Sequence, residues 1–178
     1  MDTAILLIRL LVGCTLICHA VQKGFGWLHG PGLARSAEIF ESLGQQPGRM
    51  KVRLAMACEL GSGLLLLAGM ATPFAAAVAA GTMIVAGGSM TMKGRTFWNA
   101  AGGGEYPFVL SAVALCLGFS GAGAYSVDAF LWDDQPWFTG VVVLVVAAAA
   151  AAPALLQSHR SQAGGERNRP SRTDATSS

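Results

Sequence analysis

The sequence predicts an all-α protein that crosses a membrane several times as a bundle of helices. Of its 178 residues, 53% are hydrophobic and only 12% are charged, whereas a soluble domain carries about 25% charged residues. The mean hydropathy is +0.50. Glycine and alanine are abundant, which suits helices whose backbones approach closely in lipid. We therefore interpret the chain as one small polytopic transmembrane helix bundle.

Five apolar runs are candidates for the spans, because a transmembrane helix needs about 20 mostly apolar residues. The runs cover residues 4–22, 52–70, 74–92, 106–119 and 138–156. Only three residues separate the second run from the third, so we expect a tight hairpin. Pro73 there suits the first turn of the following helix. The fourth run is the shortest, and glycines follow it.

These runs divide the chain into a four-helix core at residues 1–136, an additional span at 137–156 and a tail at 157–178. The core includes a loop at residues 24–50, within which residues 33–43 are predicted to form a short amphipathic helix on the membrane surface or across the end of the bundle. The tail is rich in Ser, Arg, Gly and Thr, so we expect it to be disordered.

The basic residues predict the orientation in the membrane. With five spans, every Lys and Arg except Arg9 falls on one side. Cytoplasmic loops carry the excess of Lys and Arg, so this side is predicted to be cytoplasmic, with the N-terminus outside and the C-terminus inside. Asp2, the lack of a basic segment before the first run and Arg9 within that run argue against a cleaved signal peptide.

The first run contains charges that need partners, because a charge at membrane depth costs about 3 kcal/mol or more. On an ideal helix, His19 lies about 80° and Lys23 about 40° from Arg9, whereas Cys14 and Cys18 lie about 140° and 180° away. The helix is therefore predicted to carry a polar stripe and a thiol stripe back to back.

Depth along the spans predicts two polar sites. His19 and Lys23 end the first span near the cytoplasm, where Glu59 and Glu105 lie at similar depth. We expect these four side chains to form an inner cluster of His/Lys–Glu pairs, either a redox or substrate site or a structural pairing that sets helix register.

The outer site would contain Arg9. The candidate partners are the Asp128 carboxylate and the Tyr125 hydroxyl, both in the loop that follows the fourth span.

Several other chemistries find little support in the sequence. Cys14, Cys18, Cys58 and Cys116 all lie within apolar runs and are expected to act as small hydrophobic residues rather than as a disulfide framework. No His, Cys and carboxylate spacing indicates a metal site, and no haem, flavin or iron–sulfur signature is evident. The basic residues are scattered over short loops and the tail, so no nucleic-acid partner is expected.

Four stretches, taken in order, resemble the DoxX family of small bacterial membrane proteins. They are LLIRLLVGCTLICHAVQKGFGW, ACELGSGLLLLAGMATPFAAAVAAGTMIVA, FWNAAGGGEYPFVL and GAGAYSVD, and together they cover roughly residues 5–128. The family's polar positions match the residues of both predicted sites, Arg9, His19, Lys23, Glu59, Glu105, Tyr125 and Asp128. Ala20 departs from the family's usual glycine, and the fifth span and basic tail extend its usual four-helix core.

The resemblance implies a bacterial cytoplasmic membrane protein with redox or thiol-linked work. Some members of the family resemble the membrane subunit of thiosulfate:quinone oxidoreductase, and others anchor superoxide dismutase and a sulfurtransferase. We therefore expect the membrane subunit of an oxidoreductase with a quinone or sulfur-linked substrate. In it Glu59 and Glu105 relay protons, and His19 and Lys23 tune these carboxylates or hold an anion. The alternatives are a non-catalytic anchor for soluble oxidative-stress enzymes and a small-molecule carrier.

Overall fold

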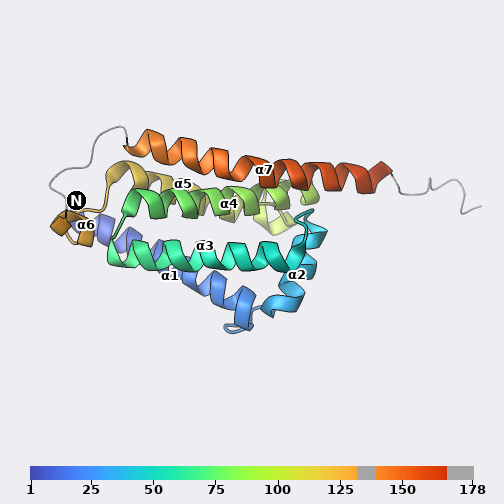
Figure 1. The fold of residues 1–178 in the computed structure, drawn as a ribbon, viewed down its shortest axis with the longest axis horizontal. Coiled ribbons are helices and arrows are strands. Elements are labelled where there is room, and N and C mark those ends of the chain that lie inside the picture. Colours follow the sequence, from blue (N-terminus) through green and yellow to red (C-terminus); the bar gives the residue numbers. More distant parts are fainter. Residues whose placement is uncertain (132–138, 168–178) are drawn as a thin grey trace, which may run out of the picture.

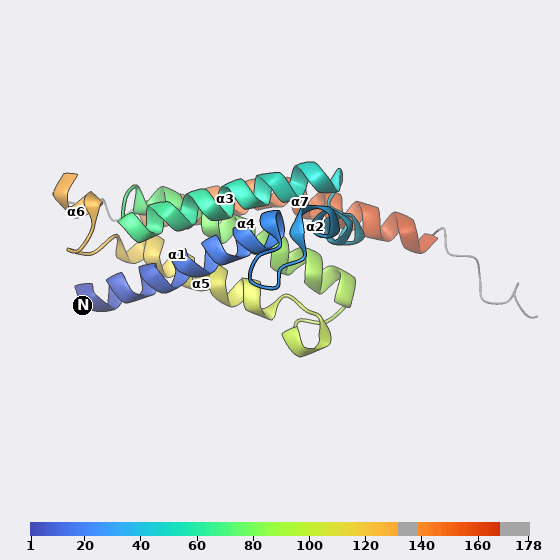
Figure 2. The same cartoon turned by 90° about the horizontal axis from the view of Figure 1, so that it is seen from below.

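The computed structural model describes residues 1–131 and 139–167, and in this part of the chain every regular element is helical. Five long helices lie side by side and alternate in direction (Figure 1, and turned by 90° in Figure 2). They are α1 (Asp2–Phe25), α3 (Gly48–Ala68), α4 (Thr72–Gly94), α5 (Glu105–Ser120) and α7 (Thr139–Arg167). The short elements are α2 (Gly32–Ser42), the 3-10 helix η1 (Asn99–Ala101) and α6 (Val127–Leu131). The predicted all-α bundle is confirmed.

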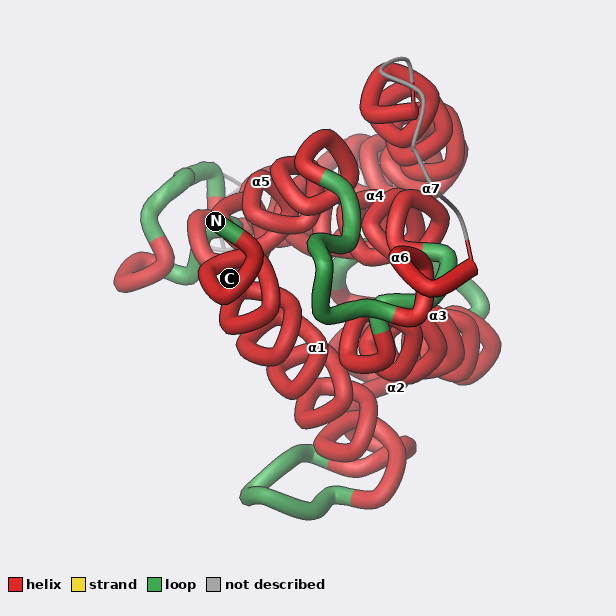
Figure 3. Tube along the Cα trace, turned by 90° about the vertical axis from the view of Figure 1, so that its left-hand side faces the viewer, coloured by secondary structure: helices red, strands yellow, loops and turns green. Residues whose placement is uncertain are grey.

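Helix α4 is central in the bundle. It packs against α3 on one side and against α5 and α7 on the other, while α1 packs mainly against α3 (Figure 3). The bundle has two distinct ends, which we call the α2 end and the α6 end after the short helix at each (Figure 1). Basic residues gather at the α2 end, namely Lys23, Arg35, Arg49, Lys51, Arg53, Lys93 and Arg95.

Three of the described helices are long and apolar enough to cross a membrane, namely α1, α4 and residues 139–164 of α7. Helix α5 is apolar but has 16 residues, about 24 Å of helix against a hydrocarbon core of about 30 Å. Helix α3 is long enough, but Arg49, Lys51, Arg53 and Glu59 lower its hydropathy. All five predicted helices are present, and the membrane character is clearest for three of them.

The turn between α3 and α4 is the predicted tight hairpin. Helix α3 ends at Ala68 and is capped by Gly69, whose φ of 65° lies in the left-handed region that glycine adopts without strain. Ala71 also has a positive φ of 47°, and α4 begins at Thr72 with Pro73 in its first turn.

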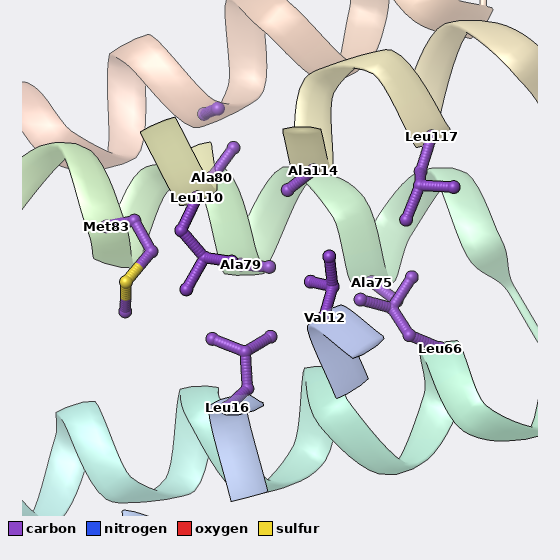
Figure 4. Close-up of a cluster of buried hydrophobic side chains, with 11 residues drawn as sticks. Val12, Leu16, Leu66, Ala75, Ala79, Ala80, Met83, Leu110, Ala114 and Leu117 are labelled. Carbon is purple, nitrogen blue, oxygen red and sulfur yellow. The ribbon is translucent and has the colours of Figure 1, made fainter. Parts of the chain in front are cut away.

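Small side chains and backbone contacts make up much of the core. Val12 and Leu16 of α1 point toward α4 and α5, where Ala79, Leu110 and Leu117 lie (Figure 4). A side chain on Gly13 of α1 would come within 2.8 Å of the Gly63 carbonyl oxygen of α3. Such backbone-to-backbone approach is how helices gain van der Waals contact in lipid, where no hydrophobic effect drives them together.

The predicted disorder of the tail is wrong for residues 157–167, because α7 continues through them. Gln157 Nε2 donates to the Gln46 carbonyl at 2.6 Å, Ser158 Oγ donates to the Leu43 carbonyl, and Gln162 Nε2 donates to the same carbonyl at 3.0 Å. The composition argument considered only apolar burial, whereas this helix is held by hydrogen bonds to the segment between α2 and α3.

Three predictions lie outside the described residues. They are the disorder of residues 168–178, the boundary at residue 136 between the core and the last span, and the start of that span at residue 138.

Candidate functional site

The polar stripe of α1 faces the bundle, as predicted. Arg9 is buried, with 1% of its surface exposed, and the Lys23 side chain is 21% exposed. Cys14 and Cys18 are both exposed on the opposite face of the helix. The two opposite stripes that helical spacing predicted are therefore present, and the polar stripe is the internal one.

Arg9 binds main-chain carbonyls and forms a closed site near the α6 end. Its Nε donates to the Leu66 carbonyl at 2.9 Å and its Nη2 to the Leu67 carbonyl at 3.2 Å, both at the C-terminal end of α3. Its Nη1 donates to the carbonyls of Ala122 at 2.6 Å and Tyr125 at 3.0 Å, both in the loop before α6. The guanidinium thus joins three segments of the chain.

The predicted partners of Arg9 need correction. Tyr125 contributes its backbone carbonyl rather than its hydroxyl, and its side chain is exposed. Asp128 influences Arg9 electrostatically, but its hydrogen bonds go to the start of α4, where Oδ1 accepts from Ala71 N at 2.7 Å and Oδ2 from Thr72 N at 2.8 Å. Asp128 therefore satisfies free N–H groups at a helix N-terminus, where a carboxylate is also favoured by the helix dipole.

Lys23 and Glu59 form the predicted ion pair of the inner site. Lys23 Nζ donates to Glu59 Oε1, and this pair joins α1 to α3. Glu59 has no exposed surface, and its second oxygen, Oε2, has no hydrogen-bond partner among the described residues. A buried carboxylate oxygen without a donor is costly, so this oxygen is the least satisfied polar atom of the inner site.

His19 lies beside Tyr106 rather than beside a carboxylate. Its Nε2 is 3.3 Å from the Tyr106 hydroxyl, and the two rings meet edge to face with centroids 5.7 Å apart. This contact joins α1 to α5. The sequence did not single out Tyr106, although its position next to Glu105 at the start of a span was the available signal.

Glu105 does not join the ion pair. Its Oε2 accepts from Asn99 N at 3.0 Å, and its own backbone N–H donates to the Phe97 carbonyl at 2.9 Å. Glu105 therefore fixes the connection between α4 and α5. The expectation that it pairs with His19 or Lys23 is wrong, because equal depth in a bundle does not set which way a side chain points around the helix axis.

A cavity of about 540 Å³ lies beside the ion pair. Its walls are predominantly apolar side chains from α2, α3, α4 and α7. The polar groups at its wall include His19, Lys23, Glu59 and Tyr106, and the other lining residues include Cys58, Val146, Ala150 and Ala154. The three residues from α7 are spaced four apart, so they share one helix face. This volume lies within the range of small-molecule sites in proteins, which are mostly apolar with a few polar groups.

Gln45 closes part of the cavity at the α2 end. The side chain is buried, with 3% exposed, and Nε2 donates to Ser89 Oγ at 3.1 Å and to the Ala154 carbonyl at 2.9 Å. It therefore ties the segment after α2 to both α4 and α7. The sequence did not identify Gln45, since a glutamine in a polar loop carries no pattern that marks it as buried.

All four cysteines are free, and among them Cys58 lines the cavity. Over residues 1–131 and 139–167, no group of three His, Cys, Asp or Glu side chains is placed to hold a metal ion.

Comparison with known protein families matches residues 4–92 to the model of the DoxX family. The match runs from α1 into the last turn of α4 and covers half of the chain. No curated protein and no solved structure matches the chain. The chain therefore belongs to the DoxX family. Glu105, Tyr125 and Asp128 lie beyond the matched stretch, so their family assignment rests on the sequence resemblance.

Proposed function

We propose that this member of the DoxX family is the membrane subunit of a redox complex and binds a quinone in the cavity beside Lys23 and Glu59. One observation carries the proposal, namely a buried carboxylate oxygen without a donor next to an apolar cavity of about 540 Å³. A quinone has an apolar body and two polar oxygens at its ring, which become hydroxyl groups when it is reduced. The reduced form can supply the donor that Glu59 Oε2 lacks.

The ion pair provides the proton chemistry in this proposal. Reduction of a quinone to a quinol takes up two electrons and two protons. Glu59 in its protonated form delivers a proton to a quinone oxygen, and the Lys23 ammonium stabilises the carboxylate that remains. Lys23 is partly exposed, so it connects the buried acid to the polar α2 end, from which the proton is replaced.

The electrons come from a partner in this proposal, since the chain has no evident redox centre of its own. The sulfur-linked systems of the family suggest a soluble subunit that oxidises a sulfur compound. The α2 end is the docking side, because it carries the basic residues that mark the cytoplasmic face of bacterial membrane proteins. This orientation places the N-terminus outside and the C-terminus in the cytoplasm.

Substitution of Glu59 tests the proposal. Glu59→Gln keeps the shape of the side chain but removes the charge and the proton that it can deliver. We expect binding of a short-chain quinol, the form that can donate to Glu59 Oε2, to weaken about ten-fold or more in the purified full chain, on the scale of one lost charge-assisted hydrogen bond. The matched control is Glu38→Gln, which changes an exposed glutamate of α2. Equal affinities of the wild type and the Glu59 variant would contradict the proposal.

The proposal also separates Glu59 from Glu105. Since Glu105 accepts from Asn99 N and lies outside the ion pair, Glu105→Gln is expected to weaken quinol binding less than Glu59→Gln does. Equal losses in the two variants would favour the four-residue cluster expected from the sequence.

A second function is a membrane anchor for soluble oxidative-stress enzymes such as superoxide dismutase or a sulfurtransferase. The observation that favours it is the length of α7, which has 29 residues and extends beyond the rest of the bundle at the α2 end (Figure 1). Removal of residues 168–178 leaves the hydrogen bonds of Gln157, Ser158 and Gln162 in place. Loss of a co-purifying enzyme with unchanged quinone binding would support the anchor.

A further inference from the structure

We propose that the groove between α1 and α3 at the α2 end is a binding site for one anionic phospholipid. The groove has a volume of about 240 Å³ and is lined by Val21 and Phe25 of α1, by Met56, Ala57 and Leu60 of α3, and by Arg53. It shares no lining residue with the cavity beside Lys23 and Glu59. The proposal is therefore independent of quinone binding.

The groove opens to the surroundings of the bundle. Phe25 is 68% exposed and Leu60 is 41% exposed, whereas Glu59, next to Leu60, is completely buried. The groove thus lies on the exposed surface of the α1–α3 pair, whereas the Glu59 side chain lies inside the bundle. In a membrane protein this face contacts lipid acyl chains, and an apolar groove there fits a chain better than a flat helix surface does.

Arg53 supplies the charge for a phosphate group. It precedes Met56 and Ala57 on α3 by one helical turn, so it lies at the end of the groove nearest the α2 end. Arg49 lies one further turn along the same face, and both side chains are exposed. Within the described part of the chain neither guanidinium has a hydrogen-bond or ion-pair partner. Two unneutralised guanidinium groups at the end of an apolar groove complement an anionic headgroup above its acyl chain.

Aromatic side chains place this end of the groove at headgroup depth. Phe25 lines the groove and contacts Trp27, with ring centroids 5.5 Å apart, and Trp27 is 67% exposed. Tryptophan favours the membrane–water interface, and arginine at the same level reaches phosphate groups. From Arg53 to Leu60 the helix rises about 10 Å, so the part of the acyl chain next to the glycerol lies along α3.

The choice of an anionic phospholipid follows from this combination. A zwitterionic lipid would bring its own positive group close to Arg49 and Arg53, which disfavours it. A partner helix would need an apolar stripe several turns long, whereas this groove spans about two turns of α3.

Quenching of Trp27 fluorescence by brominated lipids tests the site in the full chain. The background protein carries Trp98→Phe, Trp132→Phe and Trp137→Phe, so that Trp27 is the only source of tryptophan fluorescence. In mixed vesicles we expect brominated phosphatidylglycerol to bind near Trp27 about five-fold more strongly than brominated phosphatidylcholine, on the scale of one basic residue at a membrane surface. Arg53→Gln is expected to remove most of this preference. Equal quenching of the unsubstituted background by the two lipids would overturn the proposal.

Two further variants separate a built site from general attraction to a basic surface. Arg160→Gln removes the same charge from an exposed position on α7 and is expected to leave the preference within two-fold of the background value. Ala57→Leu fills the groove at an exposed position and is expected to reduce quenching by both lipids. An equal effect of Arg160→Gln and Arg53→Gln, or unchanged quenching with Ala57→Leu, would show diffuse electrostatic binding and overturn the proposed site.

Discussion

Two charged residues of α1, Arg9 and Lys23, turn toward the same bundle but meet different surroundings. Arg9 donates to four carbonyl oxygens near the α6 end. Lys23 meets one carboxylate, that of Glu59, which keeps an unpartnered oxygen beside the cavity of about 540 Å³. The first site is closed and the second is open.

This difference is the reason that we assign a structural role to Arg9 and propose a ligand-binding role for the Lys23–Glu59 pair. Carbonyls at helix ends and in turns are fixed by the backbone, so the planar guanidinium of Arg9 holds three segments in one arrangement. The Lys23–Glu59 pair leaves hydrogen-bonding capacity unused in a place that a small molecule can reach. A buried charge with every partner in place is a structural element, whereas one with a vacancy at a cavity is a candidate for ligand binding.

The largest expected effect is at the closed site. Arg9→Met keeps much of the apolar length but leaves buried carbonyls of α3 and of the loop before α6 without a donor. Each such group costs about 1–3 kcal/mol, so we expect a loss of about 4 kcal/mol or more in the free energy of unfolding. Thermal denaturation in mild detergent measures it. Arg9→Lys is the matched variant and is expected to recover only part of the lost stability, because an ammonium cannot donate to all of the same carbonyls. An unchanged midpoint for Arg9→Met would refute the structural role.

Breaking the open site should cost less, and the loss should be recoverable. Lys23→Met leaves the buried Glu59 without its partner and is expected to lower the free energy of unfolding by about 3 kcal/mol. The double variant Lys23→Met with Glu59→Leu removes both charges and is expected to regain most of this stability, because an apolar pair can replace a buried ion pair. Thermal denaturation of the single and the double variant in mild detergent measures this recovery. No recovery in the double variant would mean that the pair supports the fold as Arg9 does.

A smaller effect is expected at Asp128, which belongs to the closed end without contacting Arg9 by a hydrogen bond. Asp128→Ala removes acceptors from the N–H groups of Ala71 and Thr72 and is expected to cost about 1–2 kcal/mol, as for other helix N-terminal caps. Asp128→Asn keeps one acceptor and should lie between this variant and the wild type. If both variants match the Arg9→Met loss, Arg9 and Asp128 form one coupled unit rather than two separate ties.

The smallest effect is expected at Gln162, which helps to tie α7 to the segment after α2. Gln162→Ala removes the donation to the Leu43 carbonyl, while Ser158 still donates to the same atom. The expected loss in the free energy of unfolding is therefore about 1 kcal/mol or less. Hydrogen exchange should therefore rise locally in residues 43–47, with the α6 end unaffected. Faster exchange across the whole bundle would mean that the two ends are not independent.

Particular residues show which features of the structure could be predicted from the sequence. Helix positions follow from apolar runs, and the period of 3.6 residues places Arg9 on the face opposite Cys14 and Cys18. The structure shows that Arg9 is buried and that the two cysteines are exposed. The pairing of Lys23 with Glu59 was predictable because few buried charges were available at that depth. Glu105 was misplaced because depth alone does not give the direction of a side chain around the helix axis.

Contacts between side chains and main-chain carbonyls could not be predicted from the sequence. A carbonyl partner has no signature in the sequence, since every residue has one, and so the binding of Arg9 by Leu66, Leu67, Ala122 and Tyr125 could not be read from residue types. The same holds for Gln162, which donates to the Leu43 carbonyl from a part of α7 that its composition predicted to be disordered.

By itself the sequence determined the helical membrane bundle, the inward face of its first helix and the family to which the chain belongs, because hydropathy and helical period are local properties. Only the tertiary structure decided which buried charge is saturated and which borders a cavity. That distinction depends on where the backbone of distant segments passes, and on the space left between α2, α3, α4 and α7 once their side chains have packed.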